Sequence, residues 1–272
     1  MINIGFVDYY LSEWHANNYP TWIAEAAAAS GEEYKIAYAW AELDVSPIDG
    51  VSTDEWCARF GAQKCDTLGE LCELSDVIVI LAPSNPETHL GYAKTVLKYG
   101  KRTYIDKTFA PDLNTALEIF CIAEQYKTPF FSTSALRYAD ELDSVPAPHT
   151  ITVTGGGSNL PEYAIHLAEM AVKKMGIGAV EVTAEPRGDQ WFFTISYDNG
   201  RIATIIYAPK FAYTVYMSCC DKQAWKAIKS PFFNGLILDM LNFFKTGEIS
   251  FDTAETLEVA RLRDMMLRAA EK

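Results

Sequence analysis

The sequence predicts an α/β protein with two domains: a doubly wound parallel sheet, then an α+β domain with a mostly antiparallel sheet. In the first half, short apolar segments alternate with helical segments, as the strands and crossover helices of a parallel sheet do. In the second half, strand patterns follow one another and hairpin turn signals appear between them. A chain of 272 residues is long enough to bury the core of both domains.

The first half contains six predicted strands separated by helices. The most distinctive is the continuous apolar run from Asp76 to Leu81, the pattern of a strand buried on both faces. Strands are expected over residues 1–7, 34–40, 61–65, 76–81, 102–105 and 129–132. Helices are expected over residues 19–29, 53–60, 68–74, 89–99 and 113–126. We therefore place the first domain, with the doubly wound parallel sheet, at residues 1–135.

The second half has a different rhythm, which begins after a polar, proline-containing connector at residues 140–148. Strands are expected over 149–154, 179–184, 191–197, 201–207 and 213–219, with a hairpin turn at Asp198-Asn199-Gly200. Helices are expected over 160–175, 232–244 and 254–270. Residues 136–272 thus form the second domain, with the last helix able to pack back on the first.

Composition excludes several classes of function. The formal net charge is −13, so the surface repels nucleic-acid phosphates and anionic lipids. The N-terminus has no signal-peptide pattern and no stretch is apolar enough for a membrane span, so we expect a cytoplasmic protein. The six cysteines form no CxxC pair, and no metal site is predicted. Cys219 and Cys220 are expected to point to opposite faces of a strand, and no function is assigned to them.

Five stretches, taken in order, resemble the Gfo/Idh/MocA family of glucose–fructose oxidoreductases and inositol dehydrogenases. They are SDVIVILAPSNPETH (75–89), GKRTYIDKT (100–108), SALRY (134–138), GGG with EYAIHLAE (155–157 and 162–169), and GEISF (247–251). The resemblance implies a Rossmann-like domain joined to a domain for substrate binding and oligomerisation. It also implies NAD or NADP as cofactor, a sugar or polyol as substrate, and a homo-oligomer formed through the second sheet.

The chain departs from the family at the turn after its first strand. Asp8, Tyr10 and Glu13 stand where the family has the three glycines of its dinucleotide fingerprint. Those glycines allow a tight turn and close approach of the backbone to the pyrophosphate, which a tyrosine blocks and carboxylates repel. The aromatic and polar segment 8–19 has two interpretations: it shapes a different ligand pocket, or its rings plug the volume of a dinucleotide.

The remaining cofactor candidates follow from the resemblance. An acidic residue that would bind the ribose is replaced by Trp40, with Glu42 and Asp44 as displaced candidates. The full set of candidate cofactor-binding residues is Asp8, Tyr9, Tyr10, Pro83, Ser84, Asn85, His89 and Asp106.

The resemblance implies that Lys107, His166 and Glu162 are the catalytic residues, and that together with Arg137 they bind the substrate. Lys107 follows a strand of the parallel sheet, at the edge where ligands bind. Glu162, His166 and Glu169 share one helix face, and histidine has a pKa suited to accept a hydroxyl proton. The same face could ligate a metal ion, but it offers one histidine and no second ligand cluster. Gly155-Gly156-Gly157 either presents amides to a substrate oxygen or is a plain turn.

Two functions are consistent with these observations, and a third is weaker. The first is an NAD(P)-dependent oxidoreductase in which Lys107 and His166 handle the proton of a secondary hydroxyl while hydride moves to or from the nicotinamide. The second is a non-catalytic relative that binds a metabolite or a partner after loss of the dinucleotide turn. The third is a metal-dependent lyase or isomerase that uses Glu162 and His166. We expect a pocket lined by Lys107, Glu162 and His166.

Overall fold

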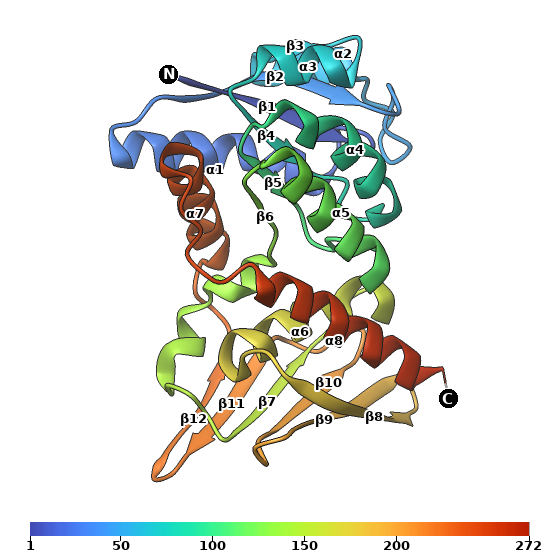
Figure 1. Cartoon of the computed structure of the whole chain (residues 1–272), viewed down its shortest axis with the longest axis vertical. Helices are drawn as coiled ribbons and strands as arrows, with labels where there is room; N and C mark the ends of the chain where they lie inside the picture. The colour runs from blue at the N-terminus through green and yellow to red at the C-terminus, as the bar shows by residue number, and fades with distance from the viewer. Residues whose placement is uncertain (272) are drawn as a thin grey trace. The chain divides into compact units, whose positions relative to one another are not determined.

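The computed structural model describes residues 1–271, and the chain divides into two compact units. The first unit comprises Met1–Ser132 and Ile237–Ser250. The second comprises Thr133–Leu236 and the chain from Phe251 onward. Each unit has its own sheet and its own core (Figure 1).

The first unit is built on a six-stranded sheet in the order β3-β2-β1-β4-β5-β6, and every pairing in it is parallel. The strands are β1 (Ile2–Asp8), β2 (Tyr34–Ala41), β3 (Gln63–Lys64), β4 (Val77–Ile80), β5 (Thr103–Ile105) and β6 (Phe130–Phe131). All four residues of β4 are buried, as its continuous apolar run predicted. This is the predicted doubly wound arrangement. The central strands β1, β4 and β5 run in parallel, so their carboxyl ends lie along the same side of the sheet.

Helices cover both faces of this sheet: α4 and α5 pack side by side on one face, and α1 lies on the other (Figure 1). The helices are α1 (Trp14–Ser30), α2 (Thr53–Phe60), α3 (Leu68–Leu74), α4 (His89–Val96) and α5 (Leu113–Tyr126). Helix α1 begins five residues before the expected start at Tyr19, because Glu13 caps it and Pro20 is accommodated inside it.

The second unit has a six-stranded mixed sheet in the order β12-β11-β7-β10-β9-β8. Only β7 and β10 pair in parallel. The strands are β7 (Thr150–Gly155), β8 (Ala179–Arg187), β9 (Gln190–Tyr197), β10 (Ile202–Tyr207), β11 (Thr214–Cys219) and β12 (Lys222–Ala227). Strand β12 was not predicted from the sequence. Helices α6 (Leu160–Met175) and α8 (Ala254–Ala270) cover one face of the sheet and form its core with it (Figure 1).

The expectation that Cys219 and Cys220 point to opposite faces of a strand is wrong. Strand β11 ends at Cys219, and Cys220 adopts a left-handed conformation with φ of 54° in the turn to β12. The two sulfur atoms consequently lie 3.8 Å apart on the same side of the chain.

The last two helices belong to different parts of the structure. Helix α7 (Phe232–Thr246) continues into the first unit from Ile237, whereas α8 is part of the second unit and packs on α6 and β8. Among the described residues, no helix is both long and apolar enough to cross a membrane.

Candidate functional site

Asp8 ends β1 at the carboxyl edge of the parallel sheet, and it is 1% exposed. One of its carboxylate oxygens accepts hydrogen bonds from the N–H groups of Tyr9, at 2.7 Å, and Ala82, at 3.0 Å. Burial, and then the nearby carboxylate of Glu13, raise the pKa of Asp8 well above its usual value. This position therefore carries a buried acid that is held by the backbone, where the resemblance predicts a glycine.

Glu13 occupies the N-terminus of α1, and its side chain is the cap of that helix. Its carboxylate accepts hydrogen bonds from the N–H groups of His15, at 2.9 Å, and Ala16. The same carboxylate lies 3.1 Å from the Nδ1 atom of His15. A helix N-terminus attracts phosphate because its first N–H groups lack partners and its dipole end is positive. Here a side-chain carboxylate already meets that requirement.

The aromatic segment after β1 divides into a buried part and an exposed part. Tyr19 is fully buried and donates to Asp106 Oδ1 at 3.4 Å, and Tyr104 donates to the same oxygen at 2.9 Å. The other oxygen of Asp106 has no hydrogen-bond partner and lies 3.9 Å from the His15 ring. Tyr19 and Asp106 are thus core residues of the first unit, whereas Trp14 is 52% exposed.

The loop after β4 holds His89, which is fully buried at the start of α4. Its two ring nitrogens lie 2.6 Å from the carbonyl oxygen of Leu81 and 3.0 Å from that of Phe109. Burial lowers the pKa of His89, although both carbonyls act in the opposite direction. The ring thereby ties β4 to the segment after β5. Ahead of it, Pro83 is buried and Ser84 is exposed.

Lys107 follows β5 in the same unit and is only 8% exposed. Its Nζ atom donates to the carbonyl oxygen of Pro83 at 3.4 Å, and the Lys107–Thr108 peptide bond is cis. The lysine therefore lies beside the loop after β4, at the carboxyl edge of the sheet, as the sequence predicted. Its role remains a prediction, as do those of the other candidate residues.

The two displaced candidates for the ribose-binding acid both have protein partners. Glu42 accepts a hydrogen bond from the Tyr92 hydroxyl at 2.6 Å, and Asp44 forms an ion pair with Lys64 at 2.6 Å.

In the second unit, His166 projects from α6 and is partly buried. The hydroxyl of Ser134 lies 2.7 Å from its Nδ1 atom, and the rings of Tyr163 and Tyr213 flank it with centroids 5.7 Å and 6.2 Å away. Ser134 Oγ also accepts from the N–H of Leu136 at 3.2 Å. Spacing along the helix did not predict Ser134 as a partner, because it lies 32 residues before His166.

Glu169 and Arg137 form a buried ion pair that is connected to His166 through Ser134. Glu169 is 3% exposed, and its carboxylate accepts from Arg137 Nε at 2.5 Å and from the N–H of Ser134 at 3.1 Å. Arg137 also reaches Glu255 at 2.6 Å and stacks on Phe251. Burial opposes the charge of Arg137, but the two carboxylates prevail and raise its pKa. This network holds Ser134, and through Ser134 it orients His166.

Glu162 lies in the first turn of α6, one turn before His166. Its carboxylate accepts hydrogen bonds from Ser158 Oγ at 3.2 Å and Asn159 Nδ2 at 3.1 Å. Asn159 in turn caps the helix by accepting from the N–H of Glu162 at 2.9 Å. The carboxylate therefore lies near the positive end of the helix dipole, which stabilises its charge.

The three glycines that precede α6 are required by packing. A Cβ atom on Gly156 would lie 1.6 Å from the Ala208 carbonyl oxygen, and one on Gly157 would overlap the Tyr163 ring. The carbonyl of Gly157 accepts from the Tyr207 hydroxyl at 3.0 Å. The segment is thus closely packed against β10 and α6.

Comparisons of sequence give no match: no family model matches the chain, and no curated protein is similar to it in sequence. Comparison with solved structures, in contrast, finds proteins that are similar over nearly the whole chain. UDP-N-acetylglucosamine 3-dehydrogenase GnnA from Acidithiobacillus ferrooxidans aligns over 98% of this chain and 97% of its own, with a TM-score of 0.77 and 14% identity. GenD2 from gentamicin A biosynthesis, solved in complex with NAD, aligns over 100% and 94%, with a TM-score of 0.79 and 15% identity.

A putative myo-inositol dehydrogenase from Sinorhizobium meliloti aligns over 100% of this chain and 98% of its own, with a TM-score of 0.75 and 13% identity. These neighbours are dehydrogenases of the Gfo/Idh/MocA type, so the resemblance predicted from the sequence is confirmed in the fold. At this level of identity, what the likeness establishes is the fold: the chain has the two-domain architecture of the Gfo/Idh/MocA dehydrogenases.

Proposed function

We propose that this protein is an oxidoreductase that acts on a secondary hydroxyl of a sugar, a polyol or a related metabolite. The observation that carries the proposal is the positioned imidazole of His166. A buried ion pair fixes Ser134, and Ser134 in turn lies 2.7 Å from the Nδ1 atom of His166. The fold, whose neighbours are dehydrogenases, supports the same class of chemistry.

The Ser134 hydroxyl lets His166 act in either direction of a proton transfer. A hydroxyl can donate to Nδ1 or accept from it. When Ser134 accepts from the Nδ1–H group, Nε2 of the neutral ring is the basic nitrogen and can take a proton from a substrate hydroxyl. The ring is then an imidazolium whose Nδ1–H group still donates to Ser134, and in the reverse reaction its Nε2–H group returns the proton to a substrate oxygen.

Lys107 is the second proposed catalytic group. A lysine ammonium favours the alkoxide form of a hydroxyl and polarises a carbonyl oxygen through its positive charge. Its low exposure strengthens both effects, because water screens its charge less. Arg137 is proposed to serve the substrate indirectly, since its guanidinium is committed to Glu169 and Glu255.

The cofactor implied by the fold does not fit the turn after β1 in the family's pose. The N–H groups of His15 and Ala16 already bond to Glu13, and the buried carboxyl of Asp8 lies at the same edge. The Glu13 carboxylate next to a pyrophosphate raises its energy by charge repulsion. We therefore derive no catalytic step from NAD or NADP bound at that turn.

A non-catalytic relative that binds a metabolite is the second candidate, and the Glu13 cap is the observation that favours it. A protein that no longer binds a dinucleotide has no need for exposed N–H groups at this helix end. Retention of Lys107 and His166 would then serve recognition of hydroxyl groups.

A substrate screen separates the two candidates. Purified protein is assayed with sugars, inositols and sugar acids in the presence of NAD and NADP, and kinetics follow on each hit. We expect His166→Ala and Lys107→Ala each to lower turnover by about a hundredfold or more. Glu162→Gln should be milder and act on the pH dependence. If a substrate binds by calorimetry but reduces neither cofactor, the binding function replaces catalysis. Activity that survives both alanine substitutions would refute the assigned roles.

We also propose a homo-oligomer formed through the sheet of the second unit. Large apolar side chains on its strands are exposed, among them Trp225 at 66% and Val180 at 53%. Light scattering of the wild type and of Trp225→Glu tests this: the wild type should be oligomeric and the variant smaller. A monomeric wild type would contradict the proposal.

A further inference from the structure

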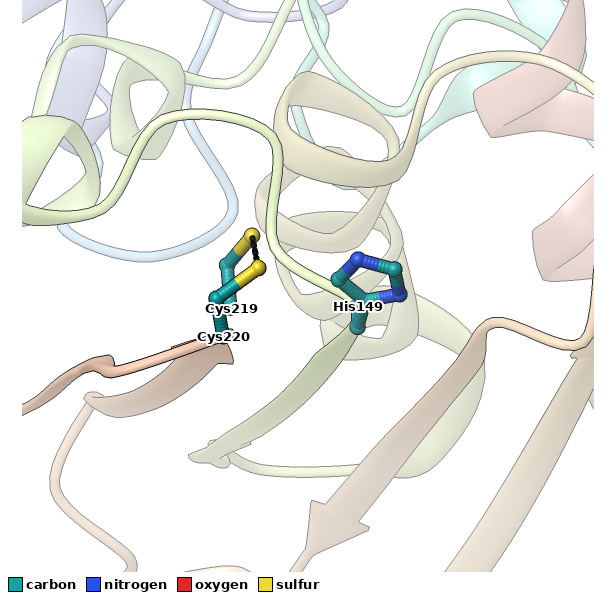
Figure 2. A group of neighbouring side chains, drawn as sticks. All are labelled: His149, Cys219 and Cys220. Atoms are coloured by element: carbon teal, nitrogen blue, oxygen red, sulfur yellow. Dashed lines mark hydrogen bonds between the residues drawn. The ribbon is translucent and has the colours of Figure 1, made fainter.

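Three side chains that commonly ligate metals meet at one end of the second unit's sheet: His149, Cys219 and Cys220 (Figure 2). One ligand atom from each lies within 4.8 Å of the others. His149 and Cys220 are exposed, and Cys219 is partly buried. Within residues 1–271, this is the one group of at least three histidine, cysteine or acidic side chains gathered so closely.

The backbone of the β11–β12 hairpin turns both sulfurs the same way. Between Cys219 at the end of β11 and Lys222 at the start of β12, only Cys220 and Asp221 form the loop. Neighbouring residues of an extended strand point to opposite faces, but the φ of 54° at Cys220 turns its side chain back toward Cys219. Glycine usually occupies such a position because it adopts this conformation without strain. A cysteine held in this conformation motivates a functional hypothesis for its side chain.

His149 is held next to this pair by two strands. Its N–H donates to the carbonyl of Ser218 at 2.8 Å, and its carbonyl accepts from the N–H of Ile202 at 3.2 Å. The antiparallel register of β7 and β11 pairs Thr150 with Ser218, so the following pair places His149 opposite Cys219. The position of the imidazole is therefore set by the sheet.

The spacing of the sulfurs matches a shared metal ion and not a disulfide. Two thiolates bound at about 2.3 Å to one tetrahedral zinc ion are about 3.8 Å apart. The Sγ atoms of Cys219 and Cys220 are 3.8 Å apart, whereas disulfide sulfurs lie at about 2.05 Å. Two sulfurs and one imidazole are a soft ligand set, which selects Zn²⁺ or Cu⁺ over Mg²⁺ or Ca²⁺.

We propose that His149, Cys219 and Cys220 form a binding site for Zn²⁺ or another thiophilic cation, which clamps the β11–β12 hairpin to the start of β7. Each thiol gives up its proton to solvent as its metal–sulfur bond forms, and no electron is transferred. Two thiolates balance the charge of Zn²⁺, and a tetrahedral ion keeps a fourth position for water or an external ligand. The site is independent of the proposed dehydrogenase chemistry.

Calorimetric titration of the reduced, metal-free protein with Zn²⁺ tests this proposal. We expect one equivalent to bind, and Cys219→Ser, Cys220→Gly and His149→Ala each to weaken the affinity by at least about a hundredfold. Cys220→Gly suits the left-handed turn, so loss of binding in this variant is not due to loss of the fold. Cys121→Ser, which removes an exposed cysteine of the first unit, is the matched control and should bind as the wild type does.

Two further measurements give the proposal independent readouts. Co²⁺ should produce a thiolate-to-metal charge-transfer band in the wild type that is absent from Cys220→Gly. Zn²⁺ should raise the melting temperature of the wild type and not that of Cys220→Gly. Failure of the wild type to bind Zn²⁺, or unchanged affinity in Cys219→Ser and Cys220→Gly, would overturn the proposal.

Discussion

The buried ion pair behind His166 gives the account its sharpest stability prediction. Arg137→Met keeps the length of the side chain but removes the charge that faces Glu169, which is 3% exposed and bonded to Arg137 Nε at 2.5 Å. Removing one partner of a buried pair costs about 3–5 kcal/mol, because the other charge stays buried without compensation. Glu255, at 23% exposure, should contribute less because water reaches it. Native proteins are stable by only about 5–15 kcal/mol, so the loss should be large.

Urea unfolding with amide hydrogen exchange in α6 measures this loss in the second unit alone. We expect Arg137→Met to lower the unfolding free energy by about 3–5 kcal/mol, and the double variant with Glu169→Met to recover much of it. Arg187→Met, which breaks an exposed ion pair with Glu185, is the matched control and should change little. A loss below about 1 kcal/mol in Arg137→Met, or a double variant as unstable as the sum of the singles, would refute the role assigned to this pair.

Two other substitutions test the packing and the electrostatics. Gly156→Ala should destabilise the second unit by about 1–3 kcal/mol in urea unfolding, because its Cβ would lie 1.6 Å from a backbone oxygen. Gly91→Ala is the control: it has open space around it and should be neutral or stabilising. Equal effects of the two substitutions on the unfolding free energy would contradict this prediction. The raised pKa of Asp8 means that wild-type stability relative to Asp8→Asn is greatest in acid and falls as pH rises above the ordinary aspartate value of 3.8. When the unfolding free energies of the wild type and of Asp8→Asn are measured from acid to neutral pH, the wild type should therefore lose stability relative to the variant as the pH rises. A difference in unfolding free energy that does not change with pH would contradict a raised pKa of Asp8.

The parallel sheet and most helices could be predicted because their signals are local. The apolar run at β4 has the length of a buried strand, and Thr53–Phe60 carries a serine cap with its capping box and ends at a glycine. The start of α1 was missed because Glu13 acts as its cap, a role that serine, threonine, aspartate and asparagine usually fill.

Long-range contacts account for what the sequence did not reveal at the candidate site. Ser134 reaches His166 only after the chain folds, since the two come from separate elements. Strand β12 was missed because its hairpin turn contains Cys220 and Asp221 and lacks the glycine that signals such turns. The same absence hid the convergence of the two cysteine side chains.

The central claim is that Glu13 fills the anion site at the N-terminus of α1, where a dinucleotide of this fold would place its pyrophosphate. Calorimetric titration of NADH into the wild type and into Glu13→Gln tests it most directly. The account predicts weak binding to the wild type and tighter binding to Glu13→Gln, because one negative charge is removed from the site. A sub-micromolar dissociation constant for the wild type that the substitution leaves unchanged would contradict the claim.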